Sequence, residues 1–172
     1  PYKVTPTASN YGNTGILETP NARMMPEAQL RFNFSASFPN EFTSLTASPF
    51  NWLEATYRYT EVKNVKYGPA SYSGNQTLKD KGFDIKTLVL KETSSLPAIA
   101  IGLRDIAGSG EFSSEYIVST KRLGQFDFSL GLGWGVLGTD NNFSNPLELF
   151  HDGFKTRDDT SDLVGTFTVK NW

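Results

Sequence analysis

The run from Gln125 to Gly138, QFDFSLGLGWGVLG, constrains the fold of this chain more than any other segment. Apolar residues alternate strictly with small or polar ones, which is the pattern of a β-strand with two different faces. The apolar phase holds Phe126, Phe128, Leu130, Leu132, Trp134 and Val136, and the other phase holds Asp127, Ser129, Gly131, Gly133 and Gly135. In a soluble protein another layer must cover the apolar face, whereas in a transmembrane barrel lipid covers it. The class of the protein depends on which of these two holds.

The composition narrows the classes of fold and partner. The 13 Phe, 7 Tyr, 3 Trp and 15 Gly among 172 residues favour antiparallel β-structure. The 16 Lys and Arg nearly balance 18 Asp and Glu, so we expect no nucleic-acid partner. Cysteine is absent, which excludes disulfides, thiolate metal sites and a cysteine nucleophile. No apolar run approaches the ~20 residues of a membrane helix, which leaves strands as the means of crossing a membrane.

Residues 1–26 form a lead segment rich in Thr, Pro, Asn and Gly, with too little apolar periodicity for a regular element. We expect an extended segment that packs on or inside the rest of the chain, as a candidate plug of a barrel lumen. Ile16-Leu17 and Met24-Met25 are its predicted anchors. The chain starts at Pro1 without a signal peptide, which we interpret as a processed or trimmed form.

Strand-like segments recur throughout residues 27–172. The predicted strands are 27–38, 41–48, 52–63, 81–92, 96–106, 111–122, 125–138 and 162–172. Strands of mostly ~9–13 residues, joined by alternately short and long connections, are typical of membrane barrels, whereas soluble sandwiches have strands of ~5–6 residues. We therefore expect an all-β fold, an antiparallel up-and-down transmembrane β-barrel of about eight strands or part of a larger barrel.

The size of the barrel bears on transport. Eight strands enclose an interior that side chains fill, so a barrel closed at eight conducts nothing. A finished outer-membrane barrel commonly ends with an aromatic residue whose apolar neighbours share its phase. Here Trp172 shares its phase with Lys170 and Thr168, while Phe167 and Val169 lie on the other phase. We therefore expect the chain to stop partway through a larger barrel, with a finished eight-stranded barrel as the alternative.

Charged residues gather on the phase opposite the aromatic and aliphatic one. If the apolar phase faces outward, the lumen receives Arg31, Glu54, Arg58, Asp84, Lys86, Arg104, Glu115, Lys121 and Asp127. Nine unpaired charges are incompatible with a dry core, but they suit a wet lumen or an internal salt-bridge network. Four of them are acidic and five basic. This balance favours structural pairing over a selective ion filter.

The sequence gives only weak signals for a catalytic or ligand-binding group of residues. His151 is the only histidine, and with Asp152 beside it in a loop it is insufficient for a metal site. The glycine-rich stretches 108–114 and 131–135 lack the following helix and the Lys-Ser/Thr pair of a phosphate loop. We predict no catalytic residue, no cofactor and no metal, and hence a protein that is not an enzyme.

Several tyrosines invite comparison with carbohydrate-binding surfaces. Tyr57, Tyr59 and Tyr116 lie in predicted strands, where an interfacial aromatic belt is the stronger interpretation. Tyr67 and Tyr72 lie in the long polar connection 64–81 instead. They are our candidates for contacting a glycan or a protein partner.

Three long stretches carry a resemblance to a known family. They are GNTGILETPNARMMPEAQLRFNFS at 12–35, PFNWLEATYRYTEV at 49–62, and the segment from KDKGFDIKTLVL to FDFSLGLGWG at 79–135. In order and spacing they resemble the YjbH-like family of Gram-negative outer-membrane β-barrel proteins, encoded with exopolysaccharide and capsule export genes. Members are several times longer, so the resemblance implies an amino-terminal portion. Members are often lipoproteins, and the cysteine of such an anchor is absent from these residues.

The resemblance implies a protein of the bacterial outer membrane with a role in exopolysaccharide or capsule secretion, as a pore or an assembly component. Its expected partners are outer-membrane lipid, a surface polysaccharide and periplasmic export proteins. Two other classes fit the residues as well. One is a soluble closed β-barrel that binds a glycan or lipid, and the other is a non-conducting scaffold barrel that anchors an envelope complex.

Overall fold

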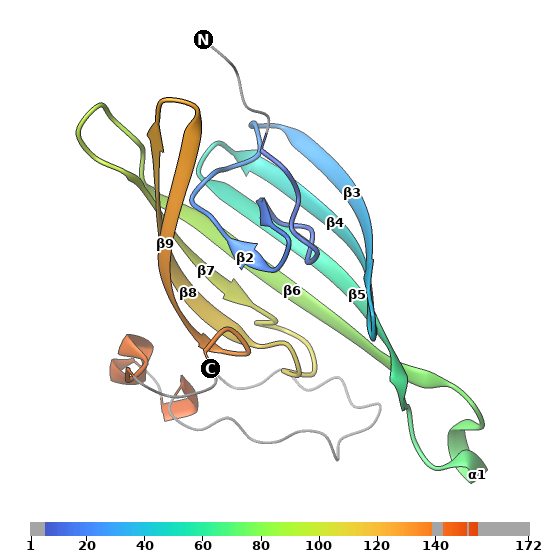
Figure 1. Cartoon of the computed structure of the whole chain (residues 1–172). Coiled ribbons are helices and arrows are strands. Elements are labelled where there is room, and N and C mark those ends of the chain that lie inside the picture. Colours follow the sequence, from blue (N-terminus) through green and yellow to red (C-terminus); the bar gives the residue numbers. More distant parts are fainter. Residues whose placement is uncertain (1–5, 139–142, 151, 155–172) are drawn as a thin grey trace.

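The computed structural model describes residues 6–138, 143–150 and 152–154, and its main element is one antiparallel sheet. Seven strands follow each other in the order β3-β4-β5-β6-β7-β8-β9, so each strand pairs with its neighbours in sequence (Figure 1). Their bounds are β3 (Gln29–Ser37), β4 (Asn40–Phe50), β5 (Leu53–Lys66), β6 (Thr77–Leu90), β7 (Ala98–Arg104), β8 (Ser114–Leu123) and β9 (Phe126–Gly135). The predicted all-β antiparallel fold is confirmed.

The lead segment contains a second, minimal sheet. Strands β1 (Gly15–Ile16) and β2 (Thr19–Pro20) pair with each other and with none of the seven strands. The sequence predicts no regular element here, and the only one among the described residues of this segment is this tight hairpin, with two residues in each strand. The seven-stranded sheet curves around the lead segment, which lies on its concave side (Figure 1). We call this side the inner face and the opposite side the outer face.

Helical structure is limited to single turns. They are α1 (Ala70–Ser73), η1 (Pro146–Leu149) and η2 (Asp152–Phe154). Asn145 caps η1, because its side chain accepts a hydrogen bond from the Leu147 amide while the Glu148 side chain accepts one from the Asn145 amide. In the part of the chain that the structure describes, no helix is long and apolar enough to cross a membrane.

Two predictions about strands differ from the structure. Strands β5 and β6 extend past their predicted ends into the polar stretch 64–81, forming a long hairpin with α1 at its tip (Figure 1). A hairpin exposed to solvent can carry Lys and Glu side chains, so the polarity of this stretch did not by itself indicate a loop. Glu61 of β5 and Lys79 of β6, for example, are register partners in it. The predicted strand 162–172 and His151 lie outside the described residues.

Barrel closure is absent from the described residues. There the sheet is open, with β3 at one end and β9 at the other. Trp172 and its neighbours, whose phase predicts a larger barrel, also lie outside the described residues. The described residues therefore form an open, curved sheet of seven strands.

The outer face carries large exposed apolar side chains on all seven strands. Residues directly opposite each other in an antiparallel pair point to the same face. Two rows in register therefore form an apolar band, each member at least 39% exposed: Phe32, Leu45, Tyr57 and Phe83 on β3 to β6, and Ile101, Ile117 and Leu132 on β7 to β9. Phe126, Phe128 and Leu130 of β9 are exposed on this face too, as the alternation predicted.

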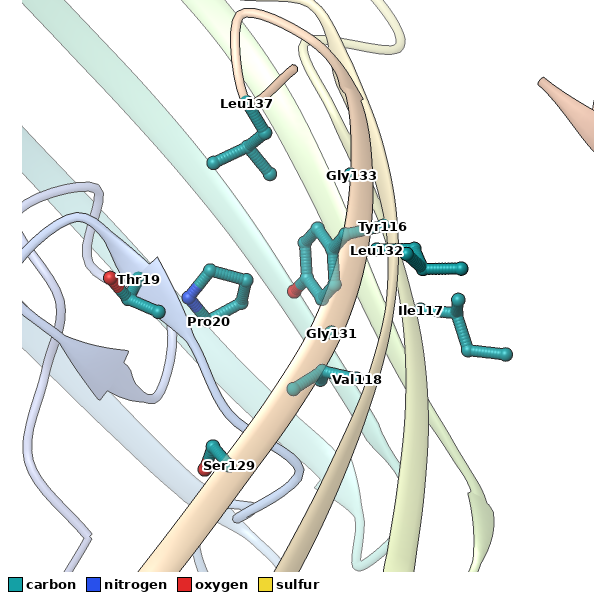
Figure 2. Close-up of a pocket in the computed structure, with 10 residues that line it drawn as sticks. All are labelled: Thr19, Pro20, Tyr116, Ile117, Val118, Ser129, Gly131, Leu132, Gly133 and Leu137. Atoms are coloured by element: carbon teal, nitrogen blue, oxygen red, sulfur yellow. The ribbon is translucent and has the colours of Figure 1, made fainter. Parts of the chain in front are cut away.

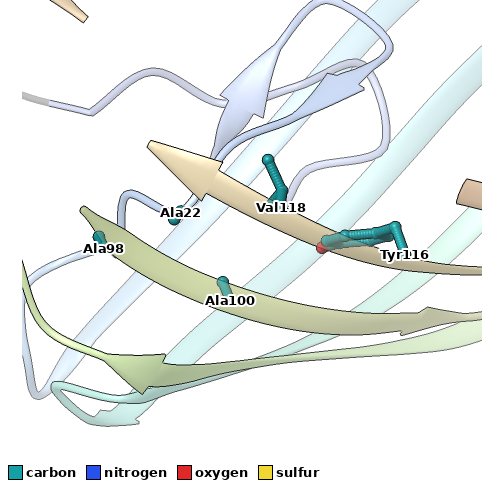
Figure 3. Packing of buried hydrophobic residues seen from close by; sticks show 5 residues of the cluster. All are labelled: Ala22, Ala98, Ala100, Tyr116 and Val118. Carbon is teal, nitrogen blue, oxygen red and sulfur yellow. The ribbon is translucent and has the colours of Figure 1, made fainter. Parts of the chain in front are cut away.

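The buried apolar residues gather on the inner face, beneath the lead segment. One cluster joins Ala22 of the lead segment to Ala98 and Ala100 of β7 and to Tyr116 and Val118 of β8 (Figure 3). A second cluster consists of Tyr11, Phe42, Val62 and Phe112. The predicted anchor Met25 is buried, whereas Ile16 and Leu17 are exposed, so the prediction for that pair is wrong. The hairpin of β1 and β2 turns both side chains away from the sheet.

Candidate functional site

The charged inner face is the candidate site, and seven of the nine predicted lumen residues lie on it. They are Arg31, Glu54, Arg58, Asp84, Lys86, Arg104 and Asp127. Five of them, Glu54, Arg58, Asp84, Lys86 and Arg104, are at most 2% exposed. Charged groups this deeply buried must be paired or hydrogen-bonded, and most of their partners come from the lead segment.

Glu54 and Lys86 stand opposite each other on β5 and β6 and bind the backbone of the lead segment. The Glu54 carboxylate accepts hydrogen bonds from the Thr14 amide at 2.8 Å, the Thr14 hydroxyl at 2.6 Å and the Met25 amide at 2.6 Å. The Lys86 ammonium donates to the Thr14 carbonyl at 2.8 Å and to the Arg23 carbonyl. Opposite charges on adjacent strands thus satisfy donors and acceptors of one extended segment.

A second set of contacts holds the turn around Gly12. The Arg31 guanidinium donates to the Gly12 carbonyl at 2.9 Å, and the Thr46 hydroxyl donates to the same oxygen at 3.0 Å. Gly12 has a φ of 100°, and a Cβ there would lie 1.9 Å from the Ser44 hydroxyl oxygen. Glycine is required at this position by both the backbone conformation and the close approach to β4.

Arg58 is the centre of a buried acidic cluster. Its Nη1 lies 3.9 Å from Asp80 Oδ2 and its Nη2 lies 3.6 Å from Asp84 Oδ1. The guanidinium also lies 5.4 Å from the ring centre of Tyr11 and 5.0 Å from that of Phe112. The Arg104 guanidinium lies over the same tyrosine, 4.1 Å from the Tyr11 ring centre. One lead-segment tyrosine therefore contacts both buried arginines through cation–π interactions.

Asp105 completes this cluster from the residue that follows β7. Its amide donates to Asp84 Oδ1 at 2.8 Å, and its carboxylate accepts from the Phe112 amide at 3.2 Å. Burial, together with the negative charge of Asp80, raises the pKa of Asp105 to about 6. Neither Asp80 nor Asp105 is among the predicted site residues: Asp80 falls in the predicted connection 64–81, and Asp105 falls in the predicted strand 96–106, whereas β7 ends at Arg104. Only the hairpin extension and the chain reversal after β7 bring them to Arg58.

Arg23 fixes the far end of the lead segment. Its Nη1 lies 2.6 Å from Glu92, while its Nε and Nη2 donate to the two Asp127 oxygens at 3.0 and 2.8 Å. Burial opposes the charged form, but the hydrogen bonds to Asp127 and Glu92 prevail and raise the pKa of Arg23. This fork-shaped pairing ties the lead segment to β9 and to the β6–β7 connection. Sequence reasoning gave no signal for Arg23, because its partners lie 69 and 104 residues away.

Glu115 and Lys121 lie on the outer phase of β8, so their predicted lumen position is wrong. They stand opposite Trp134 and Phe128 of β9. The prediction placed the apolar phase of β8 outward, but Tyr116 and Val118 face inward. They pack against Ala22, because the lead segment offers β8 an apolar surface on the inside.

Both charges find partners on the outer side. Asn145 donates to the Glu115 carboxylate at 3.0 Å, so the segment that carries η1 covers it. The Lys121 ammonium lies 3.5 Å from Glu92 and donates to the carbonyls of Thr93, Ser94 and Leu96. These two residues therefore stabilise connections at opposite ends of β8.

Tyr67 and Tyr72, the loop candidates, both belong to the β5–β6 connection. The Tyr67 amide donates to the Gln76 carbonyl at 3.0 Å at the base of this loop, and its side chain is half-buried. Tyr72 lies in α1 and is 78% exposed. Among the described residues, no cluster of His, Cys, Asp and Glu could hold a metal ion.

The comparisons with known proteins identify the family. A family model described as "Exopolysaccharide biosynthesis protein YbjH" matches residues 7–172. A protein of Escherichia coli (strain K12) named "Uncharacterized lipoprotein YjbH" is 42% identical over 167 residues, which cover 96% of this chain and 24% of that protein. The chain thus spans about a quarter of the length of this relative. No solved structure matches the chain. Because the family model matches nearly all of its residues, the chain belongs to the YjbH family of exopolysaccharide biosynthesis proteins.

Proposed function

We propose that this chain forms part of the wall of an outer-membrane β-barrel that serves the secretion of exopolysaccharide or capsule. The observation that carries the proposal is the opposite character of the two faces. Large apolar side chains are exposed on the outer face of all seven strands, while five charged side chains of the inner face are at most 2% exposed. Exposed apolar patches of this extent mark an interaction surface, and a band of this kind with a polar interior matches a lipid-facing barrel wall.

The family supports the connection to exopolysaccharide, and the relative from Escherichia coli is named a lipoprotein, which fits a protein of the cell envelope. The partners in this proposal are outer-membrane lipid, the surface polysaccharide and periplasmic export proteins. The protein acts on the polymer without catalysis, and nucleic acid has no part in it.

A non-conducting scaffold is the second candidate, and one observation favours it. The lead segment lies across the inner face and is held there by Glu54, Lys86 and Arg31. A lumen filled by this segment would not pass a polymer. The soluble closed barrel is less favoured, because it would leave the outer apolar band in water.

Location is tested on the purified protein and on cell fractions. We expect the protein in the outer-membrane fraction, and a folded form that requires detergent and migrates differently in gels before and after heating. A folded monomer in plain buffer would refute the membrane proposal.

Conductance and polymer output distinguish a pore from a scaffold. Planar bilayers with the purified protein are compared with bilayers that carry the Glu54→Ala variant, in which the lead segment loses three hydrogen bonds. A channel that widens in the variant supports a pore that the lead segment closes. If neither the wild type nor the variant conducts, and gene deletion abolishes secreted polysaccharide, the scaffold is supported. Normal polysaccharide output after deletion would contradict both.

A further inference from the structure

The inner phase of β9 is unusual because glycine replaces side chains where the lead segment passes. A pocket of about 230 Å³ lies there, between β2 of the lead segment and strands β8 and β9 (Figure 2). A Cβ at Gly133 would lie 2.8 Å from Leu137 Cβ, so Leu137 folds back over this glycine and forms one wall. A Cβ at Gly131 would lie 3.0 Å from the Ile117 carbonyl oxygen. Glycine in a strand commonly marks a place where another group approaches the backbone closely.

The walls of the pocket combine apolar side chains with polar groups. Tyr116 and Pro20 face each other across it, and Val118 and Leu137 close its sides (Figure 2). The Tyr116 ring lies flat over Gly102, where a Cβ would come within 2.1 Å of the ring carbon Cζ. The absence of a side chain at Gly102 therefore leaves room for the Tyr116 ring in this orientation.

The polar side-chain groups at the pocket are hydroxyls, and none of the residues that line it is charged. Thr19 and Ser129 contribute hydroxyls, and the Ser129 hydroxyl shares a hydrogen bond of 2.8 Å with Thr120. The Tyr116 hydroxyl, on the Pro20 side in Figure 2, is buried and makes no hydrogen bond within the described residues. A buried hydroxyl without a partner is unfavourable by about 1–3 kcal/mol, so a water or a ligand group is expected to supply the partner.

We propose that this pocket binds one neutral sugar ring. Such a ring offers C–H faces to Pro20, Val118 and the Tyr116 ring, and hydroxyls to the pocket hydroxyls. An acidic sugar is disfavoured, because its carboxylate would enter a pocket with no charged partner. An acyl chain is disfavoured, because it would leave the hydroxyls unpaired. The neutral ring chemistry follows from the lining, whereas the choice of a sugar rests on the proposed role in exopolysaccharide secretion.

The test is a binding titration with the purified protein in an amine-oxide detergent, which carries no sugar. The probes are methyl glucoside and methyl galactoside, methyl glucuronide as the acidic counterpart, and lauric acid as the acyl chain, followed by saturation-transfer NMR. We expect saturable binding of at least one neutral glycoside and at least tenfold weaker binding of the glucuronide.

Two pairs of variants locate the binding. Leu137→Trp fills the pocket and should weaken binding at least tenfold, while Leu130→Trp, the same change on the outer face of β9, should leave it unchanged. Tyr116→Phe removes only the hydroxyl and should weaken binding about twofold to tenfold. Tyr57→Phe is its control on the outer face.

Several results would overturn the proposal. They are no binding of either neutral glycoside, equal binding of the glucuronide, preference for lauric acid, or a Leu137→Trp protein that still binds normally. None of these results touches the membrane location, which fractionation decides separately. Conversely, sugar binding in a protein whose deletion leaves polysaccharide output normal would refute the proposed function and leave the pocket standing.

Discussion

At the scale of single residues, the inner face stabilises charges that a dry core would reject. Arg58 is fully buried between Asp80 and Asp84, and two aromatic rings lie within 5.4 Å of its guanidinium. Asp105 adds a third carboxylate near this one guanidinium, and its burial, together with the negative charge of Asp80, raises its pKa. Its φ of 55° is a conformation that Asn and Asp tolerate better than other residues.

Replacement of Asp105 by Asn should change how stability depends on pH. The pKa of Asp105 rises from 3.8 to about 6 on folding, so the folded protein binds the proton more tightly. The stabilisation from this group is complete below about pH 3.8 and is lost as the pH rises to about 6. The variant keeps the backbone conformation and should be more stable than the wild type above pH 6, by up to about 3 kcal/mol at ~1.4 kcal/mol per pKa unit.

The measurement is the midpoint of thermal unfolding of the purified protein between pH 4 and pH 8. Glu111→Gln, at an exposed residue of the same connection, serves as the control and should follow the wild type. A wild-type advantage over Asp105→Asn that grows with pH would contradict the assigned direction.

Gly102→Ala should destabilise the protein through the Tyr116 ring. The new Cβ would lie within 2.4 Å of three atoms of that side chain, so the ring must move. We expect a loss of about 1–3 kcal/mol in the free energy of unfolding, typical of overpacking. The double variant Gly102→Ala/Tyr116→Ala should lose less than the sum of the single changes, since the smaller side chain makes room. Strict additivity in denaturant titrations would show that the ring is not the cause.

At the scale of elements, the lead segment depends on the strands for its conformation. Its own sheet comprises only two residues per strand, and side chains of the seven-stranded sheet supply most of its remaining hydrogen bonds. Glu54 accepts three of these bonds, from Thr14 and Met25. The segment is therefore placed by tertiary contacts and not by local propensity.

Removal of the Glu54 carboxylate should release the lead segment. Breaking a buried charged network by losing one partner costs roughly 3–5 kcal/mol, much of it from the charge left behind. We expect trypsin to cleave after Arg23 at least tenfold faster in Glu54→Ala than in the wild type, with Glu54→Gln between them. Glu61→Ala, which removes a partly exposed carboxylate of the same strand, is the matched control. Equal cleavage in all four proteins would mean that Glu54 does not hold the segment.

At the scale of the whole molecule, the curved sheet separates an apolar exterior from a charged interior. The two outer rows hold only exposed apolar side chains, with Glu115 and Lys121 of β8 as paired charges beside them, while the inner side holds the buried ion pairs. This is the reverse of a soluble protein, in which charge lies outside. Exposed apolar surface of this extent marks an interaction surface, and we propose lipid as its partner.

A charge in the outer band should therefore oppose insertion into a bilayer. Leu45→Arg places a guanidinium in the row of Phe32, Tyr57 and Phe83, and should cost about 2–4 kcal/mol of folding free energy in phospholipid vesicles. Tyr72→Arg, at the tip of the β5–β6 hairpin, should change it by less than about 1 kcal/mol. If Leu45→Arg folds into vesicles as well as the wild type, the band does not face lipid.

Much of the fold could be predicted, because strand alternation is a local signal. The segments of β3, β4, β7, β8 and β9 agree with the predicted segments to within a few residues, and the alternation of β9 gave its outward phase correctly. The candidate site was predicted less well. Glu115 and Lys121 were placed on the wrong face, because β8 carries apolar residues on both phases and only Ala22 decides which phase is covered.

Local alternation along the chain is enough to predict antiparallel strands with two unlike faces, since successive side chains on a strand must point to opposite sides. The tertiary structure alone decided where the lead segment lies and which charges it meets. Thr14 reaches Glu54 across 40 residues and Arg23 reaches Asp127 across 104. An extended segment without periodicity gives no local signal of its partners, because its backbone N–H and C=O groups can bond to any acceptor or donor that the folded sheet presents.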